Sequence, residues 1–72
     1  MTAWAIIING EIDLQTINGT DVGAMANWLY VVMGALHVTP TEADIRASFA
    51  AMKDQAGANV EVCPVEIRRV LQ

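Results

Sequence analysis

The chain of 72 residues carries a formal net charge of −4, with 54% hydrophobic and only 17% charged residues. We expect residues 1–72 to form one domain. A domain this small buries only about 60–65% of the surface of its unfolded chain, and a single cysteine cannot form an internal disulfide, so we expect a second copy to support the fold. The acidic balance excludes non-specific nucleic acid binding, and one histidine with one cysteine cannot make a structural zinc site, so no cofactor is expected.

The N-terminal segment predicts a β-hairpin. Residues 3–8 are rich in strand-forming side chains, Asn9-Gly10 is a strong turn signal, and residues 11–17 begin by alternating polar and apolar side chains. Because the first strand is apolar on both sides, we expect it to be central in a sheet or covered by a partner. The residues before it lack the basic stretch of a secretory signal, which favours a cytoplasmic protein.

Two registers of this hairpin place different side chains together. A two-residue turn pairs Ile7 with Ile12. A three-residue turn with Gly10 in the left-handed region pairs Ile6 with Ile12 instead. We predict the second register, because it unites the larger apolar side chains on one face. These side chains are Trp4, Ile6, Ile12 and Leu14.

A first helix is predicted over residues 21–37, with Thr20 as its N-cap and Asp21 favourable to the helix dipole. It is apolar nearly all round, so one stripe can pack on the sheet while the other must meet the second helix or a second molecule. The uncharged stretch from Val22 to Leu36 is shorter than the ~20 residues of a membrane span, so no membrane insertion is expected.

The surplus apolar surface predicts an interface between two copies, most simply a two-fold homodimer. For Trp28 alone, core packing and interface contact are equally favoured, and the Tyr30 hydroxyl suits an interface rim. The residues assigned to the predicted interface are Trp4, Trp28, Val31, Ala35 and Tyr30.

A second helix is predicted to begin at Thr39, with Pro40 in the first helical position and Glu42 completing a capping box. It should end near Gln55 or Ala56, because Gly57 can take the left-handed conformation that follows a helix.

The last segment predicts a closing strand. Asn59 to Val62 alternates in one phase and Val65 to Ile67 in the other, which a bulge at Cys63-Pro64 would reconcile. A helix capped by Cys63 and Pro64 is the alternative. The expected fold is α+β with the order ββααβ, an antiparallel sheet of the hairpin and the C-terminal strand packed against two helices.

Few side chains offer chemistry, and each has an ordinary structural explanation. His37 suits a helix C-terminus, and Cys63 lies in an apolar run without a cationic neighbour. The remaining candidates are a carboxylate pair typical of a solvent-facing strand and a basic pair that could hold an anion: Glu11 with Asp13, and Arg68 with Arg69. No catalytic, metal or nucleotide signature is present, so we expect no enzyme.

Several motifs resemble those of small bacteriophage and prophage proteins: Trp4-x-Ile6, Gly10-x-Ile12, Thr16, Thr20, Ala26-Asn27-Trp28-Leu29 and Val62-x-Pro64-Val65-x-Ile67. Asp21 departs from the basic residue expected there, and the resemblance implies no reaction, cofactor or site.

Together these observations predict a non-enzymatic protein-interaction module that self-associates, in a phage setting an accessory protein that binds a host or phage protein. The alternative is a small-molecule-binding or catalytic protein with its site at an oligomer interface, where His37 would lie near acidic side chains of a neighbouring chain.

Overall fold

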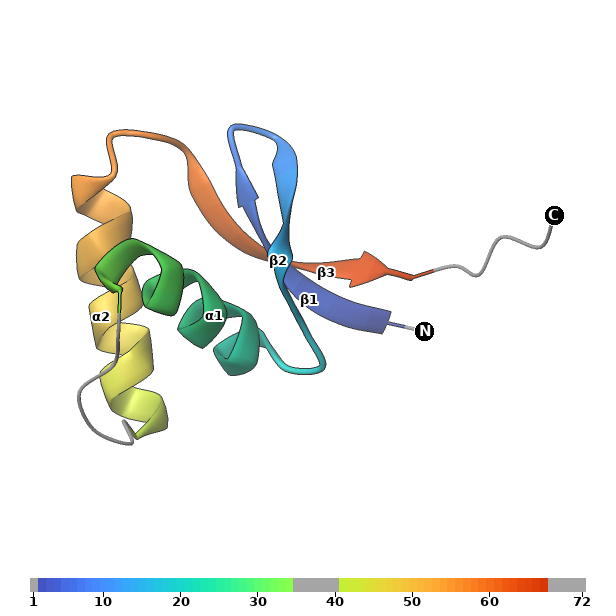
Figure 1. The fold of residues 1–72 in the computed structure, drawn as a ribbon, viewed down its shortest axis with the longest axis horizontal. Coiled ribbons are helices and arrows are strands. Elements are labelled where there is room, and N and C mark those ends of the chain that lie inside the picture. Colours follow the sequence, from blue (N-terminus) through green and yellow to red (C-terminus); the bar gives the residue numbers. More distant parts are fainter. Residues whose placement is uncertain (1, 35–40, 68–72) are drawn as a thin grey trace, which may run out of the picture.

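The computed structural model describes residues 2–34 and 41–67. Three strands form one antiparallel sheet in the order β2-β1-β3, so β1 is central, as its two apolar sides predicted. The α+β fold with the order ββααβ is confirmed (Figure 1). In chain order the elements are β1 (Thr2–Ile8), β2 (Glu11–Asn18), α1 (Asp21–Met33), α2 (Glu42–Gln55) and β3 (Val60–Glu66).

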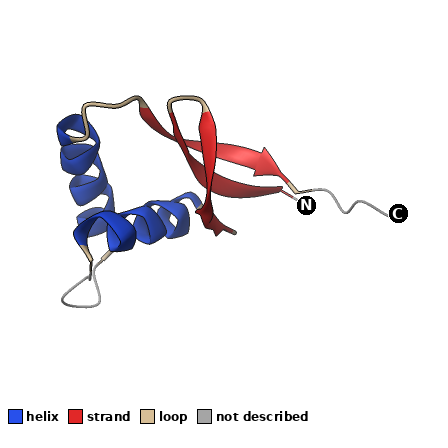
Figure 2. Cartoon of the chain, turned by 45° about the horizontal axis from the view of Figure 1, so that its top comes forward, coloured by secondary structure: helices blue, strands red, loops and turns tan. Residues whose placement is uncertain are grey.

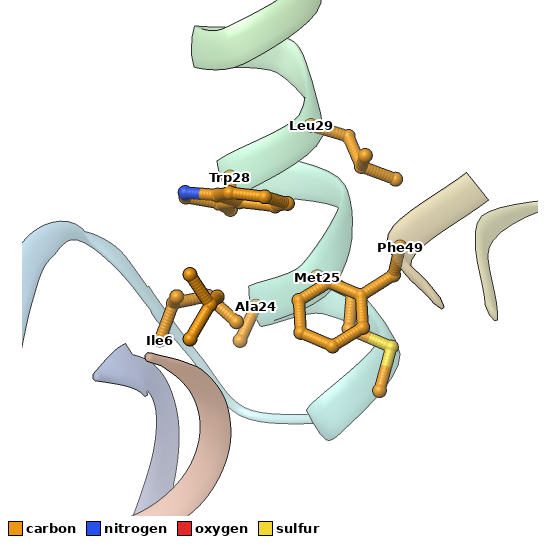
Figure 3. Packing of buried hydrophobic residues seen from close by; sticks show 7 residues of the cluster. Ile6, Ala24, Met25, Trp28, Leu29 and Phe49 are labelled. Carbon is orange, nitrogen blue, oxygen red and sulfur yellow. The ribbon is translucent and has the colours of Figure 1, made fainter. Parts of the chain in front are cut away.

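The helices lie on one side of the sheet (Figure 2). α1 packs against all three strands, and α2 packs mainly against α1. Trp28 of α1 meets Phe49 of α2 edge to face, with ring centroids 5.5 Å apart. The buried cluster joins both helices to β1 and β3 and consists of Ile6, Ala24, Met25, Trp28, Leu29, Phe49 and Val60 (Figure 3).

The hairpin register is the two-residue one, so the predicted three-residue turn is wrong. Ile8 pairs with Glu11 and Ile7 with Ile12. Asn9 and Gly10 have φ values of 51° and 84°, the left-handed pair of a type I′ turn, whose twist matches the flanking strands. Asn9 also extends the β1–β3 ladder, because its N–H donates to the Asn59 carbonyl over 2.8 Å.

A bulge in β2 explains why the prediction from apolar area gave the wrong register. The pairing shifts between Ile6, opposite Asp13, and Trp4, opposite Asn18, so β2 holds several more residues than β1 over this interval. The fully buried Thr16 fills the gap: its hydroxyl accepts from the Ile6 N–H over 2.9 Å and donates to the Asp13 carbonyl over 2.6 Å. The side chain thus replaces a missing ladder partner.

α1 begins as predicted and ends earlier than predicted. Thr20 is the N-cap, with its hydroxyl accepting from the Gly23 N–H over 2.9 Å. The helix stops at Met33, and not at residue 37, because Gly34 takes φ 83° and donates its N–H to the Tyr30 carbonyl.

α2 begins later than predicted. Its N-cap is Thr41, which forms the capping box with Asp44, whereas the prediction used Thr39 and Glu42. The two threonine–acid patterns overlap with an offset of two residues, so spacing alone does not rank them. The predicted end is confirmed: α2 stops at Gln55, and Gly57 has φ 67°.

β3 runs straight through Cys63 and Pro64, so the predicted bulge and the alternative helix are both wrong. The strand pairs with β1 in one continuous register from Val60 to Glu66. Asn9 and Asn59 form a hydrogen-bonded pair, and alternation then makes Pro64 a non-hydrogen-bonded partner of Trp4. The proline nitrogen therefore faces the outer edge, where no ladder bond is missing.

Candidate interaction surface

The sheet has a second face that no described helix covers. Trp4, Ile6 and Ile8 point toward the helices, so the alternate positions of β1 and their partners point away. We call this surface the open sheet face, and the strand register assigns to it Ala3, Ala5, Ile7, Ile12, Glu61, Cys63 and Val65.

The composition of the open sheet face is unusual for a solvated sheet. Antiparallel sheets with one covered face normally alternate apolar side chains inward with polar ones outward. Here the outward positions of the central strand are all apolar, and Glu61 is the only charged side chain among the seven residues of this face. Ile12 is 48% exposed and Ile7, Cys63 and Val65 are half-buried, whereas Ala3 and Ala5 on the central strand are only 4% and 0% exposed in one copy.

A second apolar surface lies at the C-terminal turn of α1, and we call it the α1 end. Four consecutive large side chains there are exposed between 44% and 59%: Tyr30, Val31, Val32 and Met33. They point around the helix and not to one side of it, because successive helical residues are about 100° apart. The chain then continues beyond Gly34 into residues that the structure does not describe.

The predicted interface residues do not form one surface. Tyr30 and Val31 are exposed at the α1 end. Trp28 is 4% exposed within the core cluster, so the alternative of core packing holds for it and it offers no surface to a partner. Trp4 is half-buried on the helix-facing side against the same cluster, and Ala35 lies outside the described residues.

The register error also hid part of the candidate surface. The predicted pairing put Ile12 and Leu14 on one face of the hairpin with Trp4, whereas Trp4 packs against the core and Ile12 and Leu14 are 48% and 75% exposed. Ile12 belongs to the open sheet face, and Leu14 lies in the bulged stretch of β2. The signal that could have revealed this surface was the unbroken apolar run of β1.

The candidate reactive side chains are not brought together. Cys63 is half-buried on the open sheet face and contacts the Glu61 carboxylate, with Sγ and Oε2 3.8 Å apart. Glu11 and Asp13 share a face as predicted, but Asp13 serves the local fold by accepting from the Gln15 N–H. His37, Arg68 and Arg69 lie outside the described residues.

Arg46 of α2, which the sequence analysis did not single out, forms an ionic link between the two helices. Its guanidinium contacts Asp21 at the start of α1 over 3.1 Å and Glu42 over 3.0 Å. The hydrogen bond from Arg46 holds the pKa of Asp21 below its usual range, helped by the Val22 N–H. The contact ties the first turn of α2 to the first turn of α1.

An open hollow of about 510 Å³ at the hairpin end is lined by Ile8, Asn9, Glu11, Ile12 and Asp13. Within residues 2–34 and 41–67, no three metal-ligating side chains gather. Neither described helix combines the length and apolar character needed to cross a membrane.

Comparison of the chain with protein-family models, with curated proteins and with solved structures finds no match.

Proposed function

We propose that this protein is a non-enzymatic interaction module that acts by self-association. The observation that carries the proposal is the large apolar side chain that one copy leaves in contact with water, namely the four exposed residues of the α1 end and Ile12 on the open sheet face. A chain with so few charges gains most from burying such surface against another chain.

The magnitude favours a reversible association. Burying a large aliphatic side chain contributes about 1.5–3 kcal/mol when it starts fully exposed, so each half-exposed residue contributes about half of that. Association itself costs at least about 4 kcal/mol in lost translational and rotational freedom. The four half-exposed residues of the α1 end, or Ile12 with the less exposed Ile7, Cys63 and Val65 on the open sheet face, therefore support at most a dimer that dissociates on dilution.

The test is sedimentation equilibrium across a concentration series at neutral pH. The expected weight-average mass rises from the 7.8 kDa of one chain toward twice that value. Added salt should leave the association unchanged or strengthen it, because salt screens the repulsion between two chains of charge −4 and does not weaken apolar contact. A mass that stays at one chain at every concentration contradicts the proposal.

A further inference from the structure

We infer that the two copies pack through the open sheet face, one sheet lying on the other around a two-fold axis. This inference rests on the proposed self-association and names the surface that performs it. The competing surface is the α1 end, and the competing geometry is strand addition at an edge of the sheet. Three features of the described chain decide between them.

The first feature is that both outer edges of the sheet are unsuited to strand addition. Along β3 the nitrogen of Pro64 faces outward and has no hydrogen to donate to an added strand. Along β2 the bulge breaks the regular spacing between Asp13 and Asn18. Bulges and prolines are common means of preventing edge-to-edge pairing. An extended peptide or the edge of another copy would therefore meet an interrupted ladder on either side.

The second feature is the charge of the open sheet face. Its only ionised side chain is Glu61, on an edge strand. An anionic partner would find no cation on this face, and a cationic partner would find one carboxylate. A second copy presents the same uncharged centre, formed by Ile7 and its neighbours, and a two-fold axis brings two such centres together. The face is therefore self-complementary in polarity.

The third feature is that the open sheet face is held rigid. β1 is hydrogen-bonded on both sides, and the tie between Asn9 and Asn59 extends its ladder with β3 to the hairpin turn. Packing through this face costs little ordering of the backbone. At the α1 end the exposed side chains point in all directions around the helix, so one flat contact can bury only part of them.

The size of the face sets the strength of the dimer. Three strands spaced about 4.8 Å apart and some seven residues long cover a planar footprint of roughly 330 Å². Corrugation by side chains enlarges the buried surface, but it stays below the ~800 Å² per partner of a standard interface. We expect association in the micromolar range or weaker, with the two sheets about 10 Å apart.

The unmodified protein provides the first test, because Cys63 is its only cysteine and lies on the open sheet face. The measurement is the rate of Cys63 alkylation by N-ethylmaleimide over the concentration range of the sedimentation series. Packing through the open sheet face predicts that the rate falls in proportion to the fraction of dimer. Packing through the α1 end predicts a rate that does not depend on protein concentration.

A matched pair of variants provides the second test. Ile12→Lys places a charge on the open sheet face, and Val31→Lys places one at the α1 end, at side chains of similar exposure, 48% and 53%. We expect the first variant to sediment as a monomer and the second to dimerise like the parent. Circular dichroism must show that both are folded; if Ile12→Lys is not, Cys63 protection in the unmodified protein decides.

The outcomes separate the inference from the proposed function. Dimerisation that protects Cys63 and that Ile12→Lys alone abolishes supports both the inference and the proposed function. Dimerisation with unchanged Cys63 reactivity, abolished by Val31→Lys alone, overturns the inference and leaves self-association standing. A chain that is monomeric throughout overturns both.

Discussion

Replacement of Thr16 by valine tests the most unusual hydrogen bonds in the fold. The change is nearly isosteric and removes only the hydroxyl, which accepts from the Ile6 N–H and donates to the Asp13 carbonyl. Because Thr16 is fully buried, no water can take the place of the hydroxyl beside the Ile6 amide. The variant should therefore fold with one unpaired donor in the centre of β1.

The magnitude follows from the burial of the two partners. A buried N–H left without an acceptor costs about 1–3 kcal/mol. The Asp13 carbonyl is only partly buried and can turn to water, so we add at most about 1 kcal/mol for it. The expected loss is about 2–3 kcal/mol, from a total of roughly 4–11 kcal/mol for a domain of this length.

Urea unfolding followed by tryptophan fluorescence measures this loss, at one fixed protein concentration because the chain is proposed to dimerise. Thr16→Ser is the matched control, since it keeps the hydroxyl and loses one methyl group, worth about 1 kcal/mol. The expected order of stability is threonine, then serine, then valine. Valine at or above the stability of serine would refute the bridging role of Thr16, as would unchanged hydrogen exchange at the Ile6 amide.

Three further substitutions probe the ends of the elements. Gly23→Ala should destabilise the fold by about 1–2 kcal/mol, because its Cβ would collide with the Asn18 side chain and lie 2.8 Å from the capping Thr20 Oγ1. In an Asn18→Ala background the same change should cost less in urea unfolding, because only the contact with Thr20 remains. Asn9→Ala should cost about 1 kcal/mol more than Asn9→Gly, because only glycine relieves the φ of 51°; equal thermal midpoints would contradict this. For Arg46→Gln, the urea midpoint should lie below that of the parent at neutral pH and converge with it under acid. Because the pKa of Asp21 is lowered in the folded state, its contact with Arg46 stabilises the fold above the ordinary pKa of 3.8. This stabilisation is lost as the pH falls through the lower folded-state pKa. A difference that persists at the most acidic pH would show that the Asp21 charge is not involved.

Strong local signals account for the part of the fold that could be predicted from the sequence. Asn9-Gly10 fixed the position of the hairpin turn, and Thr20 and Gly57 marked where α1 begins and where α2 ends. Each of these residues acts within a few positions along the chain. The sequence alone could therefore place five elements in order and identify the class of the fold.

The errors concern choices that depend on contacts between distant residues or on competing local signals. The hairpin register was judged by apolar area, but it is stabilised by the Thr16 hydroxyl, whose bond to Ile6 spans ten positions along the chain. Thr39 and Thr41 offered equivalent caps for α2. Pro64 was taken as a sign of irregularity, although at a non-hydrogen-bonded position of an edge strand it fits a regular register.

The candidate surface was only half predictable for the same reason. The composition indicated that apolar surface would remain outside one copy, and Tyr30 and Val31 are among the exposed large side chains, while their part in an interface stays a prediction. The Trp28 side chain lies in the core because Phe49 of α2 packs against it. The open sheet face depends on the true register, and the sequence pattern favoured the other one.

The pairing of β1 with β3 has a consequence for how the chain folds as it is made. β1 is synthesised before both helices, yet the strand that completes one of its two sides follows them, and the hydrogen bond between Asn9 and Asn59 joins positions fifty residues apart. The hairpin alone is marginally stable in water. During most of the synthesis of residues 2–67, β1 is therefore paired only with β2, and the sheet is completed only after β3 has been made.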